Sequence, residues 1–417
     1  MKAAFRMLLA CGLCALCAAA HANTTAPRPL LAQGDQSDRS RGDAVRMRQA
    51  QDLSLVPVPQ PETDMPQIVD GAPRGRVRMA LLLPLRSPTL KPAAEMVRDG
   101  FRAAHERDGA NVDLTVIETD DFAPNILSAY RNAAPHYDVM IGPLSRSAVT
   151  ALANSGDVSR PTIALAQPEI SGDADIRLPP QMVVMGLSIE DEARQAADWA
   201  ALDHAGGKAL IVSTGVAWQK RAARAFVSQW QRSGAAVDVL ALSTTGTFLE
   251  GPGLAQLKKR LAADPPALVF VALDASQTRQ LRGAIDPGIA IYGTSQLNPL
   301  SLPELAGAEP HPELDGVHLL DMPWQLQADH PAVMIYPHPL TIGEQRRGPD
   351  MERLYALGID AFRVASEIGA GQRDFTIDGV TGRLLIRFDG NEPALFGRIE
   401  QQAVYGNGVV QAVPGAR

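Results

Sequence analysis

Cysteine is scarce in this chain and confined to its beginning. Three of the 417 residues are cysteine, and all of them lie within the first seventeen positions, at Cys11, Cys14 and Cys17. A chain that has no cysteine beyond this point cannot form internal disulfides, use a thiolate as nucleophile or ligate a metal through sulfur there. These classes of redox, catalytic and metal chemistry are therefore excluded for nearly the whole sequence.

The cysteines belong to a segment with the pattern of an export signal. Lys2 and Arg6 precede an uncharged apolar run, and Ala20-His21-Ala22 has the small-x-small pattern of a cleavage site. We expect a signal peptide at residues 1–22, which places the protein in the periplasm. The alternative is an outer-membrane lipoprotein anchored through Cys11, but Arg6 leaves only four apolar residues before that cysteine.

Positive charge and long apolar runs are also lacking. Lys and Arg number 39 against 46 Asp and Glu, which gives a formal net charge of −7. Such a balance gives no basic patch for nucleic acid. No apolar run approaches the length of a membrane span, so we predict no membrane crossing. Residues 23–75 are rich in Pro and free of aromatics, which predicts a disordered tether that cannot form a core.

Local signatures of enzyme chemistry are missing as well. The sequence contains no G-x-S-x-G, no Ser-x-x-Lys, no H-x-H and no H-E-x-x-H motif. Four histidines, His311, His318, His330 and His338, gather late in the chain, but their spacing matches no familiar zinc motif and prolines surround them. We expect no enzyme activity, no metal and no cofactor. A hydrolase stays open only if these histidines converge on a metal.

From residue 76 short apolar runs alternate with segments of helical periodicity, the pattern of parallel strands covered by helices. Nine strands are too many for one ordinary sheet, so we predict an α/β fold with two doubly wound parallel-sheet lobes joined by hinge crossovers. The predicted strands are Met79–Leu83, Leu114–Glu118, Val139–Gly142, Thr162–Ala166, Val183–Gly186, Ala209–Ser213, Val237–Leu242, Leu268–Leu273 and Ile289–Tyr292.

The C-terminal third predicts a long helix at 350–369 and antiparallel strands at 382–390 and 396–413. We assign residues 76–187 and 316–372 to lobe 1, and residues 188–315 and 373–417 to lobe 2. Ligands of parallel sheets bind beyond the carboxyl ends of the strands, in loops and at helix N-termini. The candidate cleft residues on this basis are Arg86, Ser87, Asp121, Ser145, Ser147, Gln167, Thr214, Asp274, Ser295 and Gln296. For Ser145 and Ser147, an N-cap of the following helix is favoured over a ligand contact.

Several segments resemble type 1 periplasmic binding proteins of the branched-chain amino-acid receptor group, in order and spacing. They are "RMALLLPL" and "MVRDGFRAA" near the start, "YDVMIGPLSRS" in the middle, and "LYALGIDAF" and "VTGRLLIRFDGN" near the end. Within that group the wording is most similar to the LpoA/LppC family of penicillin-binding protein activators. The resemblance implies a two-lobed binding-protein fold and a non-enzymatic partner of a class A penicillin-binding protein in peptidoglycan synthesis.

Two functions remain open at this point. One is activation of a penicillin-binding protein by direct contact, with the chain acting as a monomer. The alternative is a solute receptor of an ABC transporter that closes on an amino acid or another small polar ligand. Receptors of this kind hold an α-carboxylate with Ser/Thr-rich turns, but the corresponding turn here contains Pro168, which offers no amide, and Glu169, which would repel a carboxylate.

Overall fold

The protein is described from a computed structural model that covers residues 75–169, 177–300, 308–339 and 348–415. These residues belong to one compact unit, Pro73–Arg417. The expected signal peptide lies outside the described residues, as does the expected tether except for its last position, Gly75.

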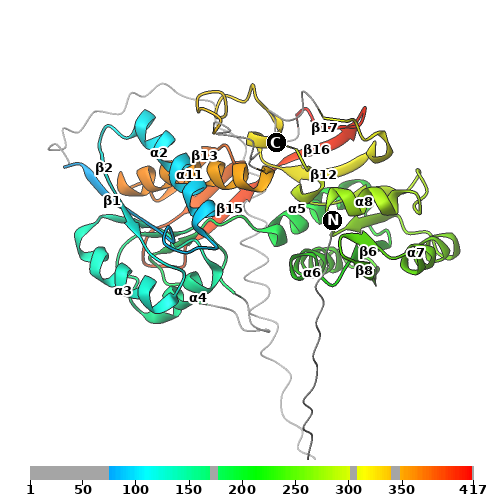
Figure 1. Ribbon diagram of the computed structural model, residues 1–417, viewed down its shortest axis with the longest axis horizontal. Coiled ribbons are helices and arrows are strands. Elements are labelled where there is room, and N and C mark those ends of the chain that lie inside the picture. The colour runs from blue at the N-terminus through cyan, green and yellow to red at the C-terminus, as the bar shows by residue number, and fades with distance from the viewer. Residues whose placement is uncertain (1–74, 170–176, 301–307, 340–347, 416–417) are drawn as a thin grey trace, which may run out of the picture. The chain divides into compact units, whose positions relative to one another are not determined.

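Five parallel strands form the first sheet, in the order β2-β1-β3-β4-β5 (Figure 1). Their bounds are β1 Val77–Leu83, β2 Val112–Glu118, β3 Val139–Ile141, β4 Thr162–Ala164 and β5 Met182–Val184. Successive β1 side chains enter opposite cores, because a strand alternates its faces. Met79 and Leu81 pack with helices α2 (Lys91–Asp108) and α11 (Pro349–Gly369), whereas Ala80 and Leu82 pack with α3 (Ala123–Ala133) and α4 (Arg146–Ser155). We call this sheet and its four helices lobe 1.

Seven strands form the second sheet, in the order β17-β16-β12-β11-β10-β6-β7. Their bounds are β6 Ala209–Ser213, β7 Val237–Ala241, β10 Leu268–Val271, β11 Ala290–Tyr292, β12 Val317–Asp321, β16 Gln401–Gly406 and β17 Val409–Ala412. Strands β7, β6, β10, β11 and β12 are parallel to one another, whereas β16 pairs antiparallel with both β12 and β17. Helices α5 (Ile189–Asp203) and α6 (Ala217–Arg232) cover one face, and α7 (Gly251–Ala263) and α8 (Ala275–Arg282) cover the other. This sheet and its helices form lobe 2.

A third, antiparallel sheet consists of β13 Asp374–Asp378, β14 Arg383–Arg387 and β15 Leu395–Ile399. Its inward residues Ile377, Leu384 and Ile386 join the core that α2 and α11 form in lobe 1. The small hairpin β8 Thr244–Thr245 and β9 Phe248–Leu249 lies in lobe 2 after β7. The nine strands predicted before residue 293, the long helix and the antiparallel C-terminal strands are all confirmed, with ends that differ by a few residues.

The expected lobe boundaries differ from the structure in two places. Strand β12 pairs with β11 in lobe 2, although residues 316–372 were assigned to lobe 1. The β13–β15 sheet packs on the lobe 1 core, although residues 373–417 were assigned to lobe 2. Strand β12 and the strands of the β13–β15 sheet are short, and the local sequence pattern does not indicate which lobe each of them joins. The chain therefore crosses between the lobes after β5, between β12 and α11, and between β15 and β16.

Helices α2 and α11 cross at an unusually short distance, and two glycines permit it. A Cβ atom added at Gly358 would collide with the carbonyl oxygen of Val97, and one added at Gly100 would collide with that of Tyr355. Because glycine has no side chain, the two helix backbones can come into direct contact at these positions. This crossing positions α11, and Arg353 near its N-terminal end pairs with Asp321 of β12 in lobe 2.

Candidate functional site

A pocket of about 510 Å³ opens between the two lobes. Lobe 1 contributes the start of α2, the turn between β3 and α4, the segment after β4 and the first turns of α11. Lobe 2 contributes the starts of α5 and α6 and the short 3₁₀ turn Ser295–Leu297. The position beyond the carboxyl ends of parallel strands is the one that the predicted fold favours for a ligand.

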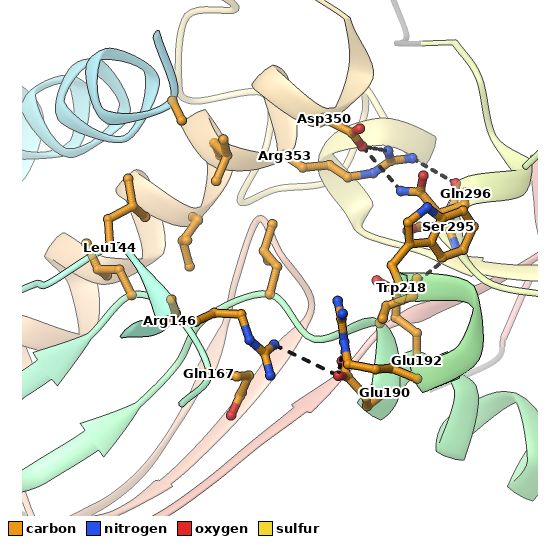
Figure 2. A pocket seen from close by; sticks show the side chains of 18 of the residues that line it. Leu144, Arg146, Gln167, Glu190, Glu192, Trp218, Ser295, Gln296, Asp350 and Arg353 are labelled. Carbon is orange, nitrogen blue, oxygen red and sulfur yellow. Dashed lines mark hydrogen bonds and ion pairs between the residues drawn. The ribbon is translucent and has the colours of Figure 1, made fainter. Parts of the chain in front are cut away.

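Much of the pocket wall is apolar, and most of these side chains come from lobe 1. The apolar lining consists of Leu90, Ala93, Leu144, Leu165, Ala166, Leu187, Ile189, Leu354 and Leu357, to which Trp218 of α6 adds a half-buried indole. Such a wall suits an apolar body rather than a highly charged one. The polar groups are concentrated in two clusters on the opposite side (Figure 2).

In the first polar cluster, one carboxylate is shared by two arginines. Glu190 Oε1 accepts a hydrogen bond from Arg221 Nε at 2.7 Å and lies 3.9 Å from Arg146 Nη1. Arg146 also donates to the carbonyl oxygen of Pro168 at 2.9 Å. The acidic side chain from lobe 2 is thus held between cations from both lobes (Figure 2). Both guanidinium groups therefore have a partner within the chain.

In the second cluster, Arg353 of α11 ties lobe 1 to lobe 2. Its guanidinium donates to both carboxylate oxygens of Asp321, at 3.1 and 2.7 Å, and to Asp350 at 2.8 Å. The same group donates to the carbonyl oxygen of Ser295 at 3.0 Å. Burial lowers the pKa of Arg353, but the nearby Asp321 and Asp350 charges raise it above its ordinary value overall. Arg353 therefore stays charged and paired.

Glu192 lies beside this cluster, in the first turn of α5. Its side chain is 7% exposed, and its Oε2 accepts the backbone N–H of Ser295 at 2.8 Å. Burial raises the pKa of Glu192 to about 7, although the bond from Ser295 and the charge of Arg353 oppose that rise. The carboxyl group can therefore change its charge near neutral pH.

Three of the ten predicted cleft residues line the pocket, namely Gln167, Ser295 and Gln296. Gln167 donates to the carbonyl oxygen of Gly186 at 3.4 Å, and Gln296 donates to Asp350 at 3.3 Å. Ser295 contributes its backbone to Glu192 and Arg353, as described above. These three residues come from two lobes and line the same pocket, and their role in ligand binding stays a prediction.

The other seven predicted residues lie outside the pocket lining, and most serve local structure. Ser145 caps α4 through Ala148 N–H, and Asp274 forms a capping box with Gln277 on α8. The Ser87 hydroxyl donates to Asp121 at 2.9 Å, and that of buried Thr214 donates to Gln219 at 2.6 Å. Arg86 and Ser147 are exposed. Helix starts attract the same side chains for capping as for binding, which is why the pattern could not separate the two.

The charged residues of the pocket were not among the predicted ones. Arg146, Glu190, Glu192, Arg221, Asp350 and Arg353 all line it. Each lies within a helix, where the side chain that faces the opposite lobe depends on how the two lobes pack. The acidic start of α5 is visible in the sequence, but favourable interaction with the helix dipole is enough to explain it. Only the fold brings the arginines to these acids.

The four late histidines do not form a metal site. No group of three or more His, Cys, Asp or Glu side chains in the part of the chain that the structure describes could hold a metal ion. His318 stacks on Tyr292, and burial lowers its pKa. His311, His330 and His338 each face one separate carboxylate, at 3.6, 3.6 and 4.0 Å. The convergence that a metal-dependent hydrolase would need is absent among these residues.

Comparison with protein families and with curated proteins finds similarity to LppC and LpoA proteins in both cases. A family model described as "LppC putative lipoprotein" matches residues 73–243. The penicillin-binding protein activator LpoA of Vibrio antiquarius is 27% identical over 348 residues, which cover 74% of this chain and 54% of that protein. The LpoA of Photobacterium profundum is 25% identical over 349 residues and is covered to 52%. The chain thus spans about half the length of the curated relatives it matches.

Solved structures give the same fold. A chain from Chromobacterium violaceum, described as a "putative branched-chain amino acid ABC transporter", is 35% identical, with a TM-score of 0.60 over 78% of this chain and 100% of that one. The C-domain of LpoA from Haemophilus influenzae, described as a regulator of PBP1A, has a TM-score of 0.62 at 20% identity, over 81% of this chain and 99% of that one. The second likeness concerns the fold alone. Among the residues described here, no helix has the length and apolar content that a membrane crossing requires.

Proposed function

Because the chain belongs to the LppC/LpoA-type branch of the type 1 periplasmic binding protein superfamily, we propose that it binds and activates a penicillin-binding protein. The observation that carries this proposal is its similarity to two proteins named as such activators, at 27% and 25% identity over about three quarters of its length. The protein would act in the periplasm as a non-enzymatic regulator of peptidoglycan synthesis. Its partner would be a class A penicillin-binding protein.

The arrangement of charges in the inter-lobe pocket supports this function over transport. A receptor for a free amino acid has to offer charged groups to the ligand's carboxylate and ammonium groups. Here Arg146 and Arg221 are engaged by Glu190, and Arg353 is engaged by Asp321 and Asp350. A ligand would have to compete with these pairs, each of which the fold already holds in place.

Activation by contact requires no reaction at the regulator itself. A surface of the chain that binds the active conformation of the synthase more tightly than the inactive one shifts the synthase population by that difference in affinity. A tenfold preference corresponds to about 1.4 kcal/mol, which a modest contact can supply. Both lobes would then serve as a rigid support for the contact surface.

The proposal is tested by binding and by activity. The exported chain is titrated against the periplasmic region of a class A penicillin-binding protein from the same organism, and glycan polymerisation from a lipid-linked substrate is followed in parallel. We expect saturable binding and a matching rise in polymerisation rate. Absence of binding at micromolar concentration, or binding without any change in rate, contradicts the proposal.

A second function is favoured by one specific observation. The Chromobacterium violaceum chain described as a transporter component is 35% identical and is covered along its whole length. A solute receptor of an ABC transporter would place an amino acid or related small polar ligand in the 510 Å³ pocket. Thermal unfolding with branched-chain amino acids, small amides and peptidoglycan fragments tests it. A ligand at a hundred times its Kd stabilises by about 2.7 kcal/mol, and Trp218→Ala should reduce that effect.

A further inference from the structure

The outward face of the β13–β15 sheet has an ordered arrangement of side chains that the inter-lobe pocket does not use. The β13 residues Asp374, Thr376 and Asp378 stand opposite the β14 residues Arg387, Leu385 and Arg383, in that order. These three stand opposite Leu395, Gly397 and Ile399 of β15. The intervening residues Ile377, Leu384 and Ile386 point inward and belong to the lobe 1 core. We call these nine outward residues the three-strand face.

The three-strand face carries an apolar stripe where a solvated sheet face would be polar. Leu395 is 52% exposed and Ile399 is 43% exposed. Between them, Leu385 lies over Gly397, since a Cβ at that glycine would stand 3.7 Å from Leu385 Cδ1. Single exposed apolar residues are ordinary, but here Leu395 and Ile399 of β15 have Leu385 of β14 over the glycine between them, so the three form one apolar stripe.

Charged side chains border the stripe, and one of them has no ion pair among the described residues. Arg387 pairs with Asp374 across the strands at 3.1 Å. Arg383 stands opposite Asp378, but Asp378 faces His330 at 3.6 Å instead, and Arg383 is exposed. An exposed guanidinium beside apolar side chains is the composition that protein interfaces favour at their centre.

A hollow of about 380 Å³ lies at one end of this face. It is lined by Thr376, Asp378, Arg383 and Ile399 of the face and by Pro323, Gln327 and His330 of the crossover between β12 and α11. The face therefore ends in a recess that could take a protruding side chain, with the guanidinium of Arg383 next to it.

A second copy of this chain, centred on the three-strand face, would bring like charges together. Arg383 and Arg387 occupy the middle strand. If two copies met face to face about a two-fold axis through the centre of the sheet, the middle strand of one would lie over the middle strand of the other. The axis can run along the middle strand or across it, and in both cases the arginines of one copy face the arginines of the other. Like charges that face each other in an interface are unfavourable. The complement is a surface with apolar and acidic side chains.

We propose that the three-strand face is the centre of the docking surface for the penicillin-binding protein, and that it receives a segment with an apolar side chain next to a carboxylate. The apolar side chain enters the hollow or lies along Leu395 and Ile399, and the carboxylate pairs with Arg383. This inference rests on the proposed function, which supplies the partner. It adds to that function the location and the chemistry of the contact.

The test compares two face variants with two matched controls in the binding assay described above. Arg383→Glu reverses the charge on the face, and Leu395→Asp breaks the stripe. Arg102→Glu on α2 is an exposed arginine elsewhere on lobe 1, and Phe248→Asp replaces an apolar residue of lobe 2 that is 68% exposed. We expect each face variant to weaken binding about tenfold or more and each control to change it less than about twofold. Thermal unfolding checks that all four variants fold.

The outcomes separate this inference from the proposed function. If the unaltered chain binds the synthase and both folded face variants bind equally well, the docking surface lies elsewhere and only the inference is overturned. If the unaltered chain does not bind, the proposed function and the inference both fall. Sedimentation of the chain alone tests self-association, and a dimer that Leu395→Asp dissociates would show that a second copy occupies the face.

Discussion

Arg353 and Asp321 form a buried, doubly hydrogen-bonded pair that joins the two lobes. The arginine, on α11 of lobe 1, is 4% exposed, and the aspartate, at the end of β12 in lobe 2, is fully buried. Asp321 also accepts the side-chain amide of Asn298 at 2.9 Å and the backbone N–H of Met322 at 2.9 Å. Each side chain neutralises the charge of the other in the buried interior.

Removal of one partner of this buried pair should therefore lower the free energy of unfolding much more than removal of one partner of an exposed pair does. We expect Arg353→Met to lower the free energy of unfolding by about 3–5 kcal/mol, because Asp321 is left charged and buried. The double variant Arg353→Met with Asp321→Leu should lose less than the sum of the two single changes. Urea unfolding measures both.

The control for this prediction is an exposed pair of the same kind. Arg387 and Asp374 are 57% and 70% exposed, so Arg387→Met should cost at most about 1 kcal/mol. Equal losses for Arg353→Met and Arg387→Met would contradict the claim that the inter-lobe pair is buried and structurally important.

Glu192 predicts a specific dependence of stability on pH. It faces Arg353, Asp321, Glu400 and the Ser295 N–H, and its pKa is raised from 4.5 to about 7. The folded state thus binds the proton more tightly than the unfolded state does. The resulting stabilisation is complete below about pH 4.5 and is lost as the pH rises to about 7.

The variant Glu192→Gln removes this titration, because its side chain is neutral at every pH. Relative to the unaltered protein, the variant should gain up to about 3 kcal/mol between pH 4.5 and 7, and the difference should then level off. Urea unfolding at a series of pH values gives the difference directly. Two curves that stay parallel across this interval would mean that Glu192 is not perturbed in this way.

The sequence predicts the strands and helices well because their signals are local. Buried parallel strands appear as apolar runs such as Ala209–Ser213, and α11 carries an apolar stripe at helical spacing. A local signal does not, however, predict which sheet a short strand joins. Strand β12 follows no local signal that favours one lobe, since its partners β11 and β16 are set by tertiary packing.

The candidate site shows the same division. Gln167, Ser295 and Gln296 were found because they follow strands whose carboxyl ends face the opening. Arg146 and Arg221 were missed because a helix presents residues in all directions, and only the placement of the other lobe selects the ones that face it. Ser145 and Asp274 cap α4 and α8 and do not line the pocket; the sequence cannot distinguish these roles because capping and binding use the same chemistry at a helix start.

The crossing of α2 and α11 provides a test of packing that needs no partner. Gly358→Ala would place a methyl group against the carbonyl oxygen of Val97, so the helices would have to separate. We expect a loss of about 1–3 kcal/mol or more. Gly283→Ala is the control, since no atom lies within 4 Å of the added Cβ and the backbone φ is −67°. That change should be neutral or slightly stabilising, and thermal unfolding should rank the two variants clearly.

The carboxylate of Glu190 determines whether Arg146 and Arg221 in the inter-lobe pocket are paired within the protein or available to bind an anion. Because its carboxylate lies 2.7 Å from Arg221 and 3.9 Å from Arg146, Glu190→Gln would leave both guanidinium groups without that partner in the pocket. We expect the variant to bind inorganic phosphate, seen as a rise in melting temperature with about 10 mM phosphate relative to chloride of equal ionic strength. The control Glu313→Gln removes the partner of Arg279, which is 45% exposed, and the carboxylate that His311 faces, and should give no such rise. If the unaltered protein shows the same rise as Glu190→Gln, its arginines are available to anions, and the receptor function gains over activation by contact.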